Sequence, residues 1–115
     1  MDKDLVELTA LEVVEGLKKG EISPLELISA AETRILETEP AINALPTLCF
    51  ERARAQAKAL MEKERHGAEN SRGWLAGLPV AIKDLTDVAG VRTTYGSTIF
   101  RDHIPKTSHP LVKRI

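Results

Sequence analysis

Residues 77 to 90 have the sequence GLPVAIKDLTDVAG, in which a short apolar run leads into a lysine and then directly into an aspartate. The run PVAI is β-branched and begins with proline, which predicts a strand at about 79–83. Because side chains alternate along a strand, Lys83 shares a face with the small Ala81, and this leaves space beside the ammonium group. The residues alone allow two interpretations: a lysine with a chemical role, or a strand end whose lysine extends into water.

The composition is that of one soluble globular domain. The chain has 115 residues, of which 43% are hydrophobic and 29% charged, and its net charge is −1. The charges are interspersed, and the aromatic residues are only two phenylalanines, one tryptophan and one tyrosine. Neither a basic patch nor a base-stacking platform is expected, so the sequence predicts no nucleic-acid partner.

Cysteine usage and the N-terminus indicate the compartment. The single cysteine, Cys49, excludes an internal disulfide and is typical of a reducing environment. Its apolar setting, PTLCF, predicts a core thiol rather than a nucleophile. The acidic N-terminus lacks the apolar stretch of a signal peptide, and no run approaches the length of a membrane span. We therefore expect a cytoplasmic protein with no membrane partner.

Helix signals dominate the first two thirds of the chain. Capping boxes in the sequences TALE and SPLE predict helices at about 10–19 and 24–38, the second of them ended by Pro40. The stretch ERARAQAKALMEKERHG predicts a third helix at about 51–66. Its contact stripe consists mainly of alanine, which buries little apolar area, so this stripe is thin for an independent core.

Several familiar sites are absent from the sequence. The stretch GLPVAIK has no glycine beside its lysine, which excludes a phosphate-binding loop. The three histidines have neither cysteine partners nor metal-ligand spacing, so no metal or cofactor is expected. Ser97 lies in YGST rather than in GxSxG and is expected to turn the chain or to cap a helix. Asp84 and Asp87 lie on a strand-to-loop segment, where their spacing gives no argument for a catalytic carboxylate pair.

The stretch GLPVAIKD, followed by DVAGVRTTYGS, resembles the pattern of the amidase signature family. That pattern has a Gly-x-Pro-x-x-x-Lys-Asp strand, then a Val-x-Gly and a Thr-Thr-x-Gly-Ser turn. The flanking segment LTALEVVEGLKKGEISPLEL is also similar to the N-terminal region of the family, and the likeness extends from about Leu8 onward. The pairing of GLPVAIKD with TTYGS is more specific than either motif alone.

The resemblance implies both a fold class and a chemistry. The implied fold is α/β: residues 1–115 would be the N-terminal part of a single mixed-sheet α/β sandwich domain, helix-rich at its start. Lys83 falls on the catalytic lysine of a Ser–cis-Ser–Lys triad that hydrolyses carboxamides. A lysine base has to be held partly dry, and an apolar strand with a small neighbour can supply that setting.

The departures from the family pattern limit what this chain is expected to do alone. In the family, the triad serines lie in a glycine- and serine-rich segment well downstream of the lysine, and nothing like it occurs before Ile115. We therefore expect an N-terminal portion of an amidase that is inactive by itself. A small-molecule amide is the expected substrate of the full-length enzyme. An unpaired strand edge at Val80–Ile82 favours association, either as a homodimer or with a partner.

Two alternatives stay open at this point. One is a non-catalytic, stand-alone interaction module derived from the same fold, in which Lys83 is an ordinary surface residue. The other is the glutamine-amidase subunit of a transfer-RNA amidotransferase, which shares the signature. The residues do not distinguish these alternatives, because the substrate-pocket residues of the family come largely from other regions.

Overall fold

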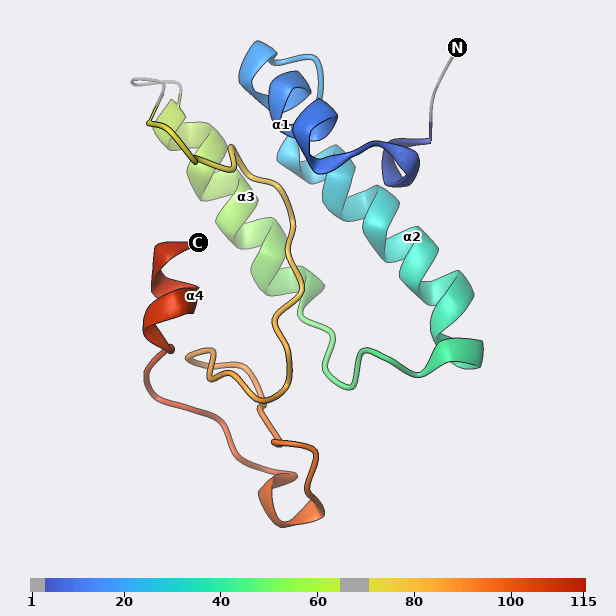
Figure 1. Cartoon of the computed structure of the whole chain (residues 1–115), viewed down its shortest axis with the longest axis vertical. Helices are drawn as coiled ribbons and strands as arrows, with labels where there is room; N and C mark the ends of the chain where they lie inside the picture. The colour runs from blue at the N-terminus through green and yellow to red at the C-terminus, as the bar shows by residue number, and fades with distance from the viewer. Residues whose placement is uncertain (1–3, 65–70) are drawn as a thin grey trace. The chain divides into compact units, whose positions relative to one another are not determined.

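The structure, a computed structural model, describes residues 4–64 and 71–115. Its elements are helices joined by turns and loops (Figure 1), and none of the described residues belongs to a β-strand. The chain forms two compact units, which we call the first and the second unit. The first unit comprises the described residues up to 43 together with 50–79, and the second comprises 44–49 and 80–115.

The first unit opens with a short 3₁₀ turn, η1 (Leu5–Glu7), followed by helix α1 (Ala10–Lys19). Thr9 caps this helix, because its hydroxyl accepts the N–H of Glu12 at 3.3 Å while the Glu12 carboxylate accepts the N–H of Thr9 at 2.8 Å. The helix ends at Gly20, whose φ of +73° is a left-handed conformation that glycine adopts at little cost. These bounds coincide with the 10–19 expected from the capping signals.

Helix α2 (Pro24–Ile42) begins at a second capping box, in which Ser23 and Glu26 exchange hydrogen bonds of 2.8 and 3.2 Å. The predicted end at about 38 is wrong, because the helix continues through Pro40. A proline removes one N–H donor from a helix. Near the C-terminus this loss is confined to the last turns, and the left-handed Asn43, with a φ of +52°, donates its N–H back to the helix and closes it.

Helix α3 (Phe50–Glu64) lies beside α2 and runs in the opposite direction (Figure 1). The Arg54 guanidinium donates to the carboxylate of Glu32 on α2, and about 70% of each side chain is shielded from solvent. Ala57 lies in the middle of the predicted alanine stripe and is buried. The helix was expected at about 51–66; it begins one residue earlier, and residues 65 and 66 lie outside the described part of the chain.

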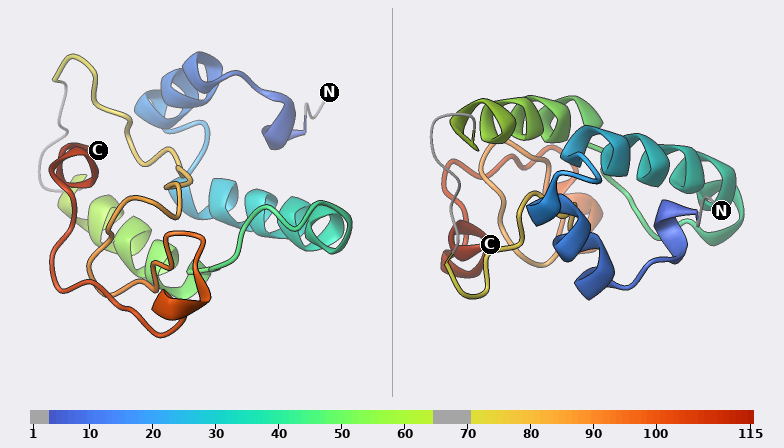
Figure 2. Two further views of the ribbon diagram at one scale, coloured as in Figure 1. Left: turned by 60° about the horizontal axis from the view of Figure 1, so that its bottom comes forward. Right: turned by 90° about the horizontal axis from the view of Figure 1, so that it is seen from above.

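A small core holds the first unit together, with α1 and α2 joined by a short turn and lying at an angle to each other (Figure 2). Its buried members and the apolar side chains packed against them are Val13, Leu17, Leu27 and Ala76, with Leu5, Leu8, Ile22, Trp74 and Leu78. Gly77 follows this core with a φ of +97°, and a Cβ placed on it would lie 2.6 Å from a ring carbon of Pro24 and 3.0 Å from Leu60. The glycine that opens GLPVAIKD is therefore required by both conformation and contact.

The second unit contains only two short helical elements, η2 (Thr98–Phe100) and α4 (Pro110–Arg114). The strand predicted at about 79–83 is not formed, and no strand occurs anywhere in residues 4–64 or 71–115. A strand requires a neighbouring strand that completes its ladder of hydrogen bonds. Because the described residues supply no such neighbour, the mixed sheet expected from the sequence is not formed within residues 4–64 and 71–115.

Candidate functional site

Lys83 lies in the second unit, where its main chain enters a turn. Its carbonyl accepts the N–H of Thr86 at 2.9 Å, and its side chain is exposed. The sequence predicts a partly dry setting for this amine, with the small Ala81 beside it. Ala81 is exposed as well, so the residues described here do not provide that setting.

Asp84, the residue after Lys83, is joined to Thr94 by both of its carboxylate oxygens. One oxygen accepts the Thr94 N–H at 2.8 Å, and the other accepts the Thr94 hydroxyl. These bonds, with the hydroxyl contributing most, hold the pKa of the Asp84 carboxyl below its ordinary value. The Asp84 carbonyl accepts the N–H of Tyr95 at 2.9 Å, so side chain and main chain bind the same turn.

The side chain of Tyr95 contacts Asp87 and His103. Its hydroxyl donates to the Asp87 carboxylate and lies 3.3 Å from Nε2 of His103. The hydrogen bond to the Asp87 carboxylate is the main cause that raises the pKa of Tyr95, and desolvation adds to it. The ring meets Phe100 edge-on, with centroids 5.1 Å apart. Together these contacts hold Tyr95 at a φ of +54°, which is uncommon for a non-glycine residue.

Main-chain hydrogen bonds connect this turn to the rest of the second unit. The N–H of Thr93 donates to the carbonyl of His103 at 3.0 Å, and the N–H of Gly90 donates to that of Pro105 at 2.9 Å. Ser97 caps η2 by accepting the N–H of Ile99, as its predicted role of turning or capping requires. Asp84, at the end of GLPVAIKD, and the TTYGS turn thus belong to one hydrogen-bonded part of the second unit.

The sequence predicts only part of this arrangement. Asp84 and Asp87 do not form a carboxylate pair for catalysis, and each instead accepts hydrogen bonds from the turn at Thr94 and Tyr95. No local pattern marks His103 as a neighbour of Tyr95. The one signal in the sequence is the co-occurrence of GLPVAIKD and TTYGS, and the contact between Asp84 and Thr94 gives that co-occurrence a physical basis.

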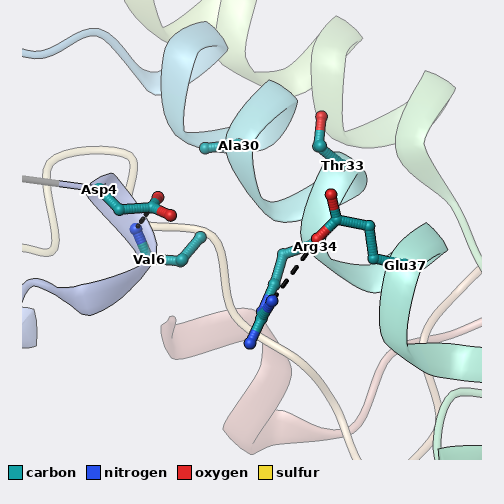
Figure 3. Close-up of a pocket in the computed structure, with 6 residues that line it drawn as sticks. All are labelled: Asp4, Val6, Ala30, Thr33, Arg34 and Glu37. Carbon is teal, nitrogen blue, oxygen red and sulfur yellow. Dashed lines mark hydrogen bonds and ion pairs between the residues drawn. The ribbon is translucent and has the colours of Figure 1, made fainter. Parts of the chain in front are cut away.

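Other parts of the described chain carry weaker candidates. Cys49, expected in the core, is exposed, because the segment before α3 lies at the surface. A hollow of the first unit, shown in Figure 3, is lined by Asp4, Val6, Ala30, Thr33, Arg34 and Glu37. A guanidinium nitrogen of Arg34, the cation of this hollow, lies 3.5 Å from a carboxylate oxygen of Glu37, and both side chains are about 60% exposed. The positive charge of Arg34 is therefore already paired and hydrated. Within residues 4–64 and 71–115, no cluster of His, Cys, Asp or Glu could hold a metal ion.

Comparison with known proteins assigns the family. Over residues 26–115 the chain matches the family described as Amidase. The chain belongs to the amidase family. The resemblance of GLPVAIKD and TTYGS to the amidase signature is thereby confirmed, and so is the identification of the chain as an amidase-family portion.

Two curated amidase relatives are A subunits of glutamyl-tRNA(Gln) amidotransferase. The chain is 40% identical over 111 residues to the one from Natranaerobius thermophilus, covering 96% of this chain and 22% of the relative. It is 42% identical over 105 residues to the one from Pelobacter propionicus, covering 91% of this chain and 21% of the relative. The chain thus spans about a fifth of the length of the relatives it matches.

A solved structure has the same fold as this amidase-family chain. It is described as a vestigial protein complex that reveals the evolutionary origins of an s-triazine catabolic enzyme. The TM-score is 0.84 at 35% identity, and the match covers 93% of this chain and 23% of the other. In the described part of the chain, no helix is both long enough and apolar enough to cross a membrane.

Proposed function

We propose that the chain is the N-terminal part of an amidase that hydrolyses carboxamides, and that Lys83 is the base of its Ser–cis-Ser–Lys triad. The observation that carries the proposal is the family match over residues 26–115, which includes Lys83 in the motif GLPVAIKD. The triad serines belong to a segment that follows this portion in the family. The single cysteine of the chain supports a cytoplasmic location.

In the proposed reaction, the neutral amine of Lys83 accepts a proton from the bridging serine, which in turn deprotonates the nucleophilic serine. The nucleophilic oxygen bonds to the amide carbonyl carbon, the C–N bond breaks, and the departing amine or ammonia takes up the proton. Water then hydrolyses the acyl-enzyme ester and releases the acid. Backbone amides near the nucleophile stabilise the developing oxyanion.

The surroundings of Lys83 explain why we expect no turnover from the 115 residues alone. A lysine acts as a base in its neutral form, and burial is what favours that form. Lys83 is exposed here, so cover has to come from protein beyond the described residues. We propose that the mixed α/β sheet supplies this cover, with residues 79–83 pairing into it as a strand.

A second candidate is the glutamine-hydrolysing subunit of a transfer-RNA amidotransferase. The names of the curated relatives support it, because the matches at 40% and 42% identity are both A subunits of glutamyl-tRNA(Gln) amidotransferase. Under this proposal the amide cut is the side-chain carboxamide of glutamine, and the protein works with other subunits. The non-catalytic interaction module remains a third candidate, in which Lys83 has no chemical role.

The test begins with the intact mass of the protein as its native source produces it, compared with 12.6 kDa for this chain. The native form is then assayed for release of ammonia from glutamine and from simple carboxamides. We expect Lys83→Ala to lower the rate at least about 100-fold, the lower range for a lost general base, without a change in melting temperature. Lys106→Ala, at another exposed lysine of the second unit, is the matched control. A Lys83→Ala enzyme that keeps its turnover would contradict the amidase proposal.

A further inference from the structure

Four hydrogen bonds hold the main chain and the side chain at Lys83–Asp84. The carbonyl of Lys83 accepts the N–H of Thr86, and the carbonyl of Asp84 accepts the N–H of Tyr95, both at 2.9 Å. The two oxygens of the Asp84 carboxylate accept the N–H and the hydroxyl of Thr94. Lys83 itself contributes no side-chain contact to this arrangement, although it is the residue that the proposed chemistry uses.

We propose that Asp84 and Thr94 form a positioning pair that sets the direction in which the Lys83 side chain leaves the main chain. The inference rests on the proposed function, because it matters only if Lys83 takes part in the reaction. A long lysine side chain has many rotamers, so a fixed starting point limits where its amine can reach. Misplacing a reacting group by about 1 Å can lower a rate about 100-fold.

The Thr94 hydroxyl both donates and accepts a hydrogen bond. It donates its proton to the Asp84 carboxylate, and its oxygen lies 3.3 Å from the N–H of Gly96, which donates to it. Thr94 is only 8% exposed, so water does not compete freely for these bonds. A carboxylate is the natural partner, because hydrogen bonds to an ionised acceptor are shorter and stronger than neutral ones. The pair therefore needs the charge of Asp84 and the hydroxyl of Thr94 together.

A purely structural role predicts different behaviour. Loss of a buried hydroxyl leaves its partners unsatisfied and lowers stability whatever Lys83 does. Thr93 provides the comparison: it is 3% exposed, it is adjacent to Thr94, and its hydroxyl donates to the carbonyl of Val91 at 3.1 Å. Thr93→Val removes a buried hydroxyl from the same segment without touching Asp84.

The test uses the native form of the enzyme with an amide that the wild type hydrolyses, at a temperature where every variant is folded. For Thr94→Val we expect kcat to fall at least about 10-fold with KM within about two-fold, because the base and not the substrate is displaced. Thr94→Ser, which keeps the hydroxyl, should restore kcat to within about three-fold of the wild type. Thr93→Val should lower the melting temperature while kcat stays unchanged.

The Asp84→Asn variant carries the test if Thr94→Val does not fold, and it is expected to lower kcat in the same way. The double variant Asp84→Asn with Thr94→Val should have a kcat no lower than that of the slower single variant, because both substitutions break the same hydrogen-bonded pair. Equal kcat losses in Thr94→Val and Thr93→Val, or no loss in Thr94→Val while Lys83→Ala is inactive, would overturn the positioning role and leave the proposed function standing. An active Lys83→Ala variant would overturn both.

Discussion

Tyr95 is the only tyrosine of the chain, and its phenol lies between the Asp87 carboxylate and the imidazole of His103. The hydrogen bond and the negative charge of Asp87 favour the neutral phenol, so its pKa lies above the ordinary value. A raised native pKa stabilises the folded state below the unfolded pKa of about 10, and this contribution is lost as pH rises through the native value.

We therefore expect the phenolate absorbance of the native chain to appear at higher pH than that of the same chain in denaturant. In Asp87→Asn the carboxylate charge is gone, and the titration of Tyr95 should move back towards the denatured curve. Asp102→Asn, at an exposed carboxylate of the same unit, is the matched control and should leave the titration where it is. Coincident native and denatured titrations would show that the contact between Tyr95 and Asp87 does not persist in solution.

Gly77 and Gly73 allow the cost of backbone conformation to be separated from the cost of side-chain contact. Both precede Lys83 in the chain and have a positive φ, +97° at Gly77 and +83° at Gly73. Nothing lies within 4 Å of a Cβ placed on Gly73, whereas a Cβ on Gly77 meets Pro24 at 2.6 Å. Gly73→Ala should cost about 1 kcal/mol for the left-handed backbone alone. Gly77→Ala should cost about 1–3 kcal/mol more from overpacking, as measured by urea unfolding. Equal costs would mean that the backbone at Gly77 shifts freely away from Pro24.

The start of α2 is stabilised by a capping box, in which Ser23 and Glu26 exchange hydrogen bonds. We expect Ser23→Ala to lower the free energy of unfolding by about 1 kcal/mol, because it leaves helix N–H groups without an acceptor. Ser29→Ala, at an exposed position inside the same helix, should be neutral or slightly stabilising, because alanine is the better helix former. Urea denaturation at pH 7 measures both; a loss in Ser29→Ala as large as that in Ser23→Ala would contradict the capping role.

The same cap makes stability depend on acid pH. Its hydrogen bonds, with the Ser23 hydroxyl contributing most, hold the pKa of Glu26 below its ordinary value. A lowered native pKa contributes stability that is present above the unfolded pKa of about 4.3 and is lost as pH falls through the native value. The difference in unfolding free energy between the wild type and Ser23→Ala should therefore shrink below about pH 4, and a difference independent of pH would count against the cap.

The sequence predicts an element well when the residues that stabilise it are close together in the chain. The capping boxes at Thr9 and Ser23 lie within four residues each, and the helices that they open start where the sequence places them. Pro40 is a weaker stop than the sequence suggests, because near the end of a helix the loss of one donor is tolerated when Asn43 can close the last turn. The strand at 79–83 depends on a neighbour that local sequence does not contain, and among the described residues it has none.

In the candidate site too, features with local causes are predicted from the sequence and features that depend on distant residues are not. Lys83 and Asp84 can be singled out from the sequence because both lie in one continuous motif, GLPVAIKD. The pairing of Asp84 with Thr94 spans ten residues and that of Tyr95 with His103 spans eight, and no periodicity reveals such contacts. The apolar run and the small Ala81 predict a partly dry Lys83, but burial depends on everything packed around a side chain, and Lys83 is exposed among the described residues. The family resemblance therefore proposes a catalytic role for Lys83, and the sequence does not predict what surrounds that side chain.

The buried core is small for a chain of this length. Among the described residues, no large side chain is fully buried, and the buried hydrophobic core consists of Val13, Leu17, Leu27, Ile28, Ala57 and Ala76. Large apolar side chains that remain exposed include Leu11, Val80, Leu85 and Ile99, at 70%, 47%, 57% and 85%. Unpartnered apolar surface of this kind is typical of interaction sites or of association. The chain spans 22% of the length of the curated relative from Natranaerobius thermophilus.

We therefore expect the 115-residue chain by itself to self-associate as its concentration rises, driven by burial of exposed apolar area. Light scattering on a sizing column should give a mass that increases with loading from the monomer value of 12.6 kDa. If the contact is the unpaired segment around Val80, the polar change Val80→Lys should restore the monomer mass, because a charge on an edge segment opposes pairing. Leu11→Lys, at an exposed position of the first unit, is the control and should leave association unchanged. Suppression by Leu11→Lys alone would place the contact on the first unit, and a concentration-independent mass of 12.6 kDa would show that the exposed side chains do not drive pairing.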